Sequence, residues 1–246
     1  MKPMRERIRG SVFESVARSA YYGVRGLSDA WEWYRESDER TKFVHIMEAV
    51  NYLRVAGLPT VFFEFGCHSG RTFSAALLAA RFLKIQLDAY AFDSFEGLPE
   101  SDEDSTGVFA KGRFRTDVRA FKDAVRARAG ITVADDHIIK GFFDDSLTAE
   151  LSDRLAPRVG FVHIDVDLYK STVPVLDFVK PKLASGSVVL FDDWYCFPVG
   201  QAAGERRAVE EFLTRNPEII FEEWKDYSGF GKSFFVVVKP TREAAA

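Results

Sequence analysis

Short apolar runs alternate with helical patterns along most of the chain, beginning near residue 60. The runs at residues 60–65, 87–92, 137–140, 159–164 and 187–191 have the length and composition of buried strands. Stretches with helical spacing of apolar residues, or rich in Ala and Leu, separate them. Strands that are apolar on both faces and are joined by helices predict a parallel sheet between two helix layers.

Two further apolar runs close the chain. Residues 219–224 and 233–238 flank a turn that contains Gly229 and Gly231. Adjacent strands joined by a short link must be antiparallel. We therefore expect an α/β fold with a doubly wound, Rossmann-like sheet of seven strands, in which five parallel strands precede an antiparallel hairpin and helices cover both faces.

The first part of the chain has a different pattern. Ile8, Val12 and Val16 fall four residues apart, and a second helical stripe spans residues 43–53. We expect an N-terminal helical cap over residues 1–58 and the main domain over residues 59–246. The cap packs passively on the core, forms a lid whose aromatic residues line a substrate site, or does both. The aromatic candidates are Tyr21, Tyr22, Trp31, Trp33 and Tyr34.

Aspartates follow two of the predicted strands. Asp165 and Asp167 come directly after one strand, and Asp192 and Asp193 come after the next. The carboxyl ends of neighbouring parallel strands open onto one crevice. A single Asp after a strand is commonly a helix cap, but crowding four carboxylates is unfavourable unless a cation or a proton-transfer role offsets it. The pattern favours a functional acidic site.

A glycine loop follows the first strand of the sheet. Glu64, Gly66 and Gly70 have the spacing E-x-G-x-x-x-G, and a helical segment follows. A strand, a glycine loop and a helix form the nucleotide-binding arrangement of doubly wound folds, although dinucleotide enzymes use G-x-G-x-x-G. Asp93, at the end of the next strand, is placed either to accept hydrogen bonds from ribose hydroxyls or to cap a helix.

Composition and charge exclude several classes of protein to which this chain could belong. A chain of 246 residues with 47% hydrophobic and 14% aromatic residues is not disordered. A net charge of -4 argues against binding nucleic acid through bulk electrostatics. No apolar run approaches the about 20 residues of a membrane helix. We expect no secretory signal, because no long apolar block with a small-residue cleavage site follows the basic N-terminus. With only Cys67 and Cys196, we expect a reduced, cytoplasmic protein and no zinc site.

Four motifs in this order resemble one enzyme family. They are EFGCHSGRT from residue 64, FDSFEGLP from residue 92, HIDVDLYKST from residue 163 and VVLFDDW from residue 188. Together they look like the macrocin O-methyltransferase family, class I S-adenosylmethionine-dependent enzymes that methylate sugar hydroxyls in macrolide and aminocoumarin biosynthesis. The resemblance covers roughly residues 60–240. It implies a methyltransferase domain that acts on a small sugar or glycoside. From the charge and the lack of a long apolar run, we expect neither nucleic acid nor a membrane as a partner.

The resemblance also implies a cofactor site. Binding of S-adenosylmethionine would involve the glycine loop, the ends of the second and third strands and the first residue of the acidic motif: Glu64, Gly66, Gly70, Asp93, Ser94, Phe95, Gly141, Phe142 and Asp165. Within this set, Asp93 would hold the ribose, and Gly141 and Phe142 would lie near the adenine.

A divalent cation, usually Mg²⁺, is the second implied cofactor. Its ligands would be Asp165, Asp192 and Asp193, and Asp165 would also accept the proton of the methylated hydroxyl. Asp167 would orient the substrate or the ligands, or exchange roles with Asp165. His163 is expected to be a buried structural residue rather than a catalytic one. Lys170 stands where the family more often has an acidic residue, which bears on substrate preference.

Other functions remain open. A catechol or another small phenol could replace the sugar because the same cation chemistry serves both. A nicotinamide-dependent oxidoreductase is disfavoured by the glycine spacing and by the lack of an obvious Tyr/Lys or His catalytic pair. A non-catalytic nucleotide-binding protein is disfavoured because unused clustered carboxylates only destabilise a fold. The sequence does not decide the acceptor, the methylated position or whether the chain forms a homo-oligomer.

Overall fold

The computed structural model describes residues 12–100, 104, 109–198, 200–201 and 203–240, with the side chains of residues 12–28 and 31 left out. The chain divides into two compact units, residues 1–41 and 42–246. The predicted cap of residues 1–58 does not share this boundary, and the division at residue 58 stays a prediction. Ile8 and the side chains of Tyr21, Tyr22 and Trp31 lie outside the description.

One helix replaces the two N-terminal helices that the sequence pattern predicts. Helix α2 spans Val12–Ala56 without interruption. In its first part Trp33 is 81% exposed and Tyr34 is 48% exposed, so neither is buried against a core. In its second part Ile46, Val50 and Leu53 are buried, as their helical spacing predicts.

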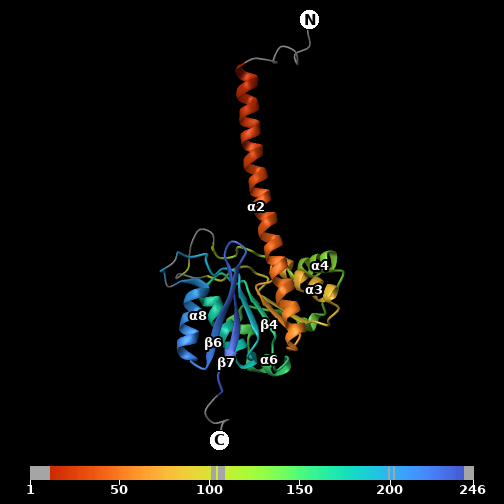
Figure 1. The fold of residues 1–246 in the computed structure, drawn as a ribbon, viewed down its shortest axis with the longest axis vertical. Helices are drawn as coiled ribbons and strands as arrows, with labels where there is room; N and C mark the ends of the chain where they lie inside the picture. The colour runs from red at the N-terminus through yellow and green to blue at the C-terminus, as the bar shows by residue number, and fades with distance from the viewer. Residues whose placement is uncertain (1–11, 101–103, 105–108, 199, 202, 241–246) are drawn as a thin grey trace. The chain divides into compact units, whose positions relative to one another are not determined.

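The sheet has the predicted architecture (Figure 1). Its order is β3-β2-β1-β4-β5-β7-β6, with β7 antiparallel to both of its neighbours. The parallel strands are β1 (Val61–Phe65), β2 (Asp88–Asp93), β3 (Ile138–Lys140), β4 (Phe161–Ile164) and β5 (Val188–Phe191). The closing pair is β6 (Ile219–Tyr227) and β7 (Gly231–Val238). Chain order reverses between β1 and β4, which creates the crevice where doubly wound folds bind ligands.

Helices cover both faces of this sheet. One apolar cluster joins the strands to α6 (Ala149–Arg154), α7 (Tyr169–Val179) and α8 (Gly204–Arg215). A second cluster joins the other face to the end of α2, α3 (Arg71–Leu83) and α4 (Val118–Ala129). The short helices are α5 (Phe143–Ser146) and the 3-10 turns η1 (Asp135–His137) and η2 (Lys180–Lys182). Alternate strand residues therefore meet different helices, which decides the direction of each side chain at the strand ends.

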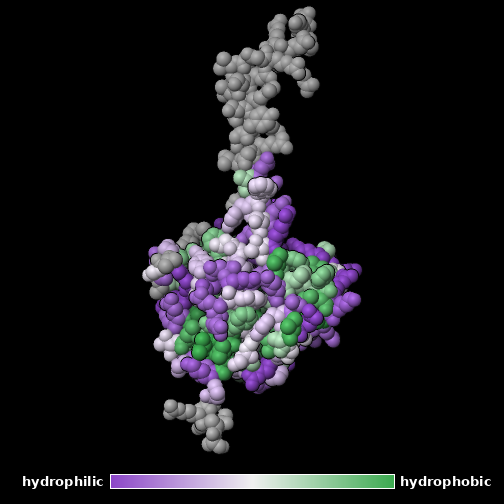
Figure 2. All heavy atoms as spheres, in the orientation of Figure 1, coloured by the Kyte–Doolittle hydropathy of each residue, from purple (hydrophilic) through white to green (hydrophobic). Residues whose placement is uncertain are grey.

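The surface of residues 42–246 combines polar and apolar side chains. Figure 2 shows hydrophilic residues over much of the visible face, interspersed with hydrophobic ones. Within the described residues, no helix combines the length and the apolar character that crossing a membrane requires.

Candidate active site

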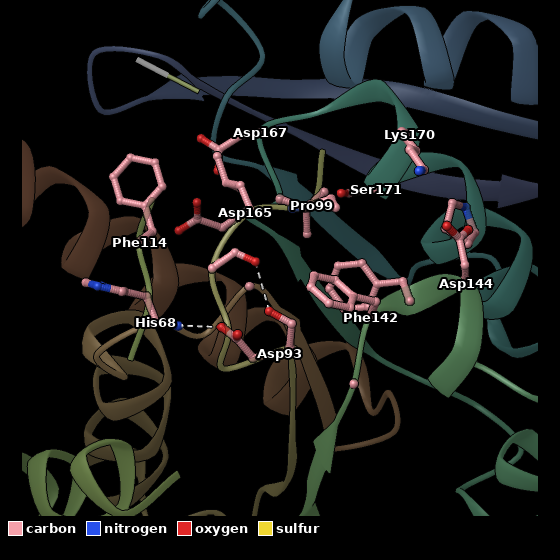
Figure 3. Close-up of a pocket in the computed structure, with 18 of the residues that line it drawn as sticks. His68, Asp93, Pro99, Phe114, Phe142, Asp144, Asp165, Asp167, Lys170 and Ser171 are labelled. Atoms are coloured by element: carbon pink, nitrogen blue, oxygen red, sulfur yellow. Dashed lines mark hydrogen bonds between the residues drawn. The ribbon is translucent and has the colours of Figure 1, made fainter. Parts of the chain in front are cut away.

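A pocket of about 300 Å³ opens at the reversal point of the sheet (Figure 3). Phe114 and His68 lie on one side of it and Phe142 on the other, with Asp165 between them. Of the predicted cofactor residues, six line this pocket: Gly66, Asp93, Ser94, Gly141, Phe142 and Asp165. The other three, Glu64, Gly70 and Phe95, do not line it and are buried beside it. We call the glycine loop (residues 66–70) and Asp93 the cofactor side of the pocket.

Gly66 holds the glycine loop against the end of β4. Its φ of 83° lies in the left-handed region, and a Cβ there would be 1.7 Å from the carbonyl oxygen of Asp165. Any side chain would therefore push the loop away from the acidic residues. Gly70, with a φ of 68°, lets α3 begin beside α4, because a Cβ would lie 2.7 Å from Val125. A backbone carbonyl at Gly66 and packed side chains at Gly70 leave no room for a Cβ, which, together with the positive φ, explains why glycine is needed.

Asp93 fixes the shape of the cofactor side. Its Oδ2 accepts a hydrogen bond from the backbone N–H of His68 at 2.8 Å, and its Oδ1 accepts one from the N–H of Phe95 at 2.6 Å. The carboxylate thus ties the glycine loop to the end of β2 while it also lines the pocket. Each oxygen retains acceptor capacity, so a structural role and ribose binding are compatible.

Three of the predicted aspartates converge next to the glycine loop. Asp165, Asp192 and Asp193 each offer a carboxylate oxygen, and these oxygens lie within 4.8 Å of one another. The strand register explains the convergence, because Ile164 pairs with Phe191 and the aspartates directly follow those two residues. We call Asp165, Asp167, Asp192 and Asp193 the acidic side.

The backbone at Asp167 is strained. Its φ is 61°, and the N–H of Leu168 donates to the carbonyl oxygen of Val166 at 2.6 Å, which closes a three-residue turn around Asp167. Such strain persists at sites where the surroundings enforce it, frequently for function. The carboxylate lines the pocket but is not one of the three that converge. In the structure, Asp165 belongs to the group of converging carboxylates and Asp167 does not. The sequence left an exchange of their roles open.

Comparison with known proteins decides the family. A profile of the macrocin-O-methyltransferase (TylF) family matches residues 38–220, about three quarters of the chain. The chain belongs to this family. Over 108 residues it is 35% identical to the 8-demethyl-8-(2,3-dimethoxy-alpha-L-rhamnosyl)-tetracenomycin-C 4'-O-methyltransferase of Streptomyces olivaceus. The matched segment covers 42% of this chain and 40% of that protein. It is 31% identical over 140 residues to the demethyldecarbamoylnovobiocin O-methyltransferase of Streptomyces niveus, 52% of each chain.

These curated relatives are matched over about half of their length or less. Solved structures show the same fold over a larger share. The O-methyltransferase NovP superposes with a TM-score of 0.65 at 19% identity, covering 79% of each chain. The calicheamicin methyltransferase CalS11 superposes with a TM-score of 0.61 at 21% identity, and the match covers 80% of this chain and 79% of that chain.

In this macrocin-O-methyltransferase family member, burial dominates the electrostatics of the acidic side. Burial, and then the charges of Asp192 and Asp193, raise the pKa of Asp165 well above its ordinary value, and Asp167 is raised in the same way. Burial and the charge of Asp192 raise the pKa of Asp193 to about 6. For Asp192 the neighbouring His163 and Lys42 outweigh burial and lower the pKa below its usual range. The carboxylates are thus crowded, and ionising all of them together is unfavourable.

The acidic side has the donor set of a hard divalent cation. Within the described part of the chain, Oδ1 of Asp192 and Oδ2 of Asp193 are buried without a hydrogen-bond partner. Oxygen atoms of this kind suit Mg²⁺. A cation at the three converging carboxylates would offset both the crowded charge and the unpaired oxygens, so the residues present fit such an ion.

The structure shows two residues that form hydrogen bonds with the acidic side and that the sequence motifs do not reveal. Nζ of Lys42 lies 2.6 Å from Oδ2 of Asp192. Oε2 of Glu205, which is 1% exposed, accepts a hydrogen bond from the backbone N–H of Asp193 at 3.0 Å. Lys42 belongs to an amphipathic helix and Glu205 to the first turn of α8, so no local pattern marks either of them.

His163 and Lys170 occupy different surroundings. The ring of His163 is fully buried, with Nδ1 3.7 Å from Oε1 of Glu64 and Nε2 3.8 Å from Oδ1 of Asp192. It therefore lies between a predicted cofactor residue and a predicted cation ligand, a position compatible with the expected structural role. Lys170 is exposed and lines the pocket, where it can affect what binds.

Proposed function

We propose that this protein is an S-adenosylmethionine-dependent O-methyltransferase that methylates a hydroxyl of a sugar or a glycosylated natural product with the help of a divalent cation. The observation that carries the proposal is the convergence of Asp165, Asp192 and Asp193 beside the pocket of the glycine loop, in a chain of this family. The names of both curated relatives refer to O-methylation of a natural product, and one refers to a rhamnosyl group.

The cofactor side would hold S-adenosylmethionine. Asp93 is oriented by two backbone N–H groups and would accept hydrogen bonds from the ribose hydroxyls. Gly141 and Phe142 line the opposite part of the pocket, where the adenine is proposed to lie. Gly66 keeps the backbone of the loop close to Asp165, which would bring the methyl group of the bound cofactor near the acidic side.

The acidic side would prepare the acceptor hydroxyl. Methyl transfer needs the nucleophile held in line with the sulfonium methyl, and much of the rate comes from that positioning. A Mg²⁺ ion held by Asp165, Asp192 and Asp193 would lower the pKa of a hydroxyl and orient the acceptor. Asp165 is the predicted proton acceptor. Asp167 is the other candidate because its carboxylate reaches the pocket and is not needed as a ligand.

An acceptor assay tests the proposal. Release of S-adenosylhomocysteine would be measured with a panel of glycosides and catechols, with Mg²⁺ or with a chelator. We expect turnover with glycosides that is lost on chelation and restored by Mg²⁺. Turnover with catechols alone would change the proposed substrate class, and turnover that resists a chelator would remove the cation from the mechanism.

Asp165→Asn tests the acidic side directly. We expect methyl transfer to fall by about 10²-fold or more, since proton transfer by a positioned side chain contributes about 10²–10⁴-fold. The affinity for S-adenosylhomocysteine, measured by calorimetry, should stay near that of the unmodified protein. Asp167→Asn is the matched comparison, and unchanged turnover in Asp165→Asn would remove Asp165 from the reaction.

The cellular location is also part of the proposal. Cys67 and Cys196 are both free thiols, which fits the reducing cytoplasm that the sequence predicts.

A further inference from the structure

Helix α2 brings a positive charge to the acidic side. Nζ of Lys42 forms a 2.6 Å ion pair with Oδ2 of Asp192, although the two residues are 150 positions apart. The side chains are 27% and 9% exposed, so the contact is largely shielded from solvent. Charge-assisted hydrogen bonds of this length are among the strong ones in proteins.

The helix is anchored where Lys42 emerges from it. One turn later, the ring of His45 stacks on Tyr227 with centroids 4.9 Å apart and lies 4.6 Å from the ring of Trp224. Glu48 forms an ion pair with Lys225 on the same strand, β6. The buried face of the helix follows at Ile46, Ala49, Val50 and Leu53. The backbone of Lys42 is therefore held in place relative to the end of β5.

The pairing leaves the two oxygens of Asp192 in different states. Oδ2 accepts a hydrogen bond from Lys42. Oδ1 is buried and, among the described residues, has no hydrogen-bond partner; Nε2 of His163 is 3.8 Å away. Carboxylates that bind metal ions are themselves generally hydrogen-bonded, and this orients the oxygen that binds the ion.

We propose that Lys42 is a positioning residue of the cation site, which holds Oδ2 of Asp192 and leaves Oδ1 as the donor to the divalent ion. This inference rests on the proposed function, because it presumes that Asp165, Asp192 and Asp193 bind a cation. It assigns the part of α2 that begins at Lys42 a role in the site: this segment not only packs on the core through Ile46, Val50 and Leu53 but also supplies the group that prepares one ligand.

Two effects of Lys42 on cation affinity oppose each other. Its charge repels the ion, whereas its hydrogen bond fixes the orientation of the Asp192 carboxylate. The ammonium is paired with the carboxylate of Asp192, whose negative charge offsets its repulsion of the ion, while the hydrogen bond acts at contact. Orientation therefore outweighs repulsion, and loss of Lys42 weakens cation binding. Removing such a supporting partner typically costs about 10–100-fold in metal affinity.

Calorimetric titration of Mn²⁺ into the full chain tests this inference without an activity assay. Lys42→Met removes the ammonium and keeps most of the stem, whereas Lys42→Arg keeps the charge. Arg54→Met is the matched control, because Arg54 is on the same helix and donates to Asn51 at 3.1 and 2.8 Å. It changes the net charge as Lys42→Met does, away from the cation site.

We expect Lys42→Met to weaken Mn²⁺ binding by about 10–100-fold, Lys42→Arg to weaken it less, and Arg54→Met to leave it unchanged. S-adenosylhomocysteine affinity should be the same in all of them. Equal or tighter Mn²⁺ binding by Lys42→Met would overturn the inference, and tighter binding would identify Lys42 as a competitor of the ion.

Two controls separate the inference from the proposed function. If the unmodified chain binds no divalent cation, the cation part of the proposed function fails, and the assigned role of Lys42 fails with it. If it binds Mn²⁺ and Lys42→Met binds equally well, only the role of Lys42 fails. Should Lys42→Met not fold by circular dichroism, Lys42→Gln decides by the same criterion, since it also removes the charge.

Discussion

The two sides of the pocket are built in different ways. The cofactor side consists mainly of backbone: Gly66 approaches the carbonyl of Asp165, and N–H groups of neighbouring residues hold Asp93. The acidic side consists of buried charged side chains, and residues distant in the sequence, such as Lys42 and Glu205, support them. Backbone geometry follows from local sequence, whereas support for a buried charge comes from wherever the fold places a partner.

Gly66→Ala should break the cofactor side and has the largest expected effect. The added Cβ would lie 1.7 Å from the carbonyl oxygen of Asp165, so the loop must move. We expect the free energy of unfolding to fall by about 3 kcal/mol or more, as for a severe steric change in a packed region. Urea denaturation gives this value, and calorimetry with S-adenosylhomocysteine should show weaker binding.

Gly57→Ala is the control for that substitution. Gly57 also has a positive φ, 66° against 83° for Gly66, but its Cβ would meet nothing within 4 Å. It measures the backbone strain alone, for which we expect about 1 kcal/mol. Similar losses in both variants would show that the conformation of Gly66 matters and its proximity to Asp165 does not.

The contrast between the two sides also explains how much the sequence could predict. The order of strands and helices follows from apolar periodicity, and the fold prediction is confirmed. The meeting of Asp165 with Asp192 and Asp193 follows from the rule that parallel strands end at one edge. These inferences need only local patterns and one topological rule.

Long-range contacts could not be predicted in this way. The pattern of α2 shows which face is apolar, but it does not show that Lys42 meets a residue 150 positions away. Nor does it show that one continuous helix runs over Val12–Ala56, because the apolar stripe is interrupted by the charged segment of residues 29–40. The partners of a buried charge depend on how the helices pack on the sheet, which no single segment encodes.

The acidic side should make stability depend on pH in the cation-free protein. The pKa of Asp193 is raised to about 6 by burial and by Asp192, and those of Asp165, Asp167 and Glu205 are raised well above normal. Groups whose pKa is raised on folding contribute stability below their unfolded value, about 4, and lose it as the pH rises through the folded value. The pKa of Asp192 is shifted in the opposite direction, so its contribution to stability has the opposite pH dependence. That contribution changes only at pH values below about 4.

We therefore expect the free energy of unfolding to decrease from about pH 4 to pH 6 and beyond. Urea denaturation at several pH values, with and without Mg²⁺, measures the slope. Mg²⁺ should reduce it because a bound cation offsets the ionised carboxylates. Asp193→Asn should flatten it between about pH 4 and 6. A flat profile in the unmodified, cation-free chain would show that these carboxylates are not crowded in solution.

Asp104→Asn should have a smaller effect than Gly66→Ala and tests how distant residues support the acidic side. The buried carboxylate of Asp104 accepts hydrogen bonds from the N–H of Tyr169 at 2.5 Å and from the N–H of Gly204 at 3.2 Å. These are the first residues of α7 and α8, the helices that follow the two acid-bearing strand ends. An amide has a single acceptor oxygen, so the variant keeps one bond at most and should lose about 1–2 kcal/mol in urea denaturation.

Asp117→Asn is the matched change on a helix of the opposite sheet face. Asp117 caps α4 by accepting from the N–H of Ala120 at 2.9 Å, and it is exposed. Asn caps a helix about as well as Asp, so we expect a change below about 0.5 kcal/mol. If Asp104→Asn also lowers Mn²⁺ affinity, the bridge between α7 and α8 contributes to the geometry of the cation site. Equal, small losses in the two variants would instead make Asp104 an ordinary cap, and the support of the acidic side would then rest on Lys42 and Glu205.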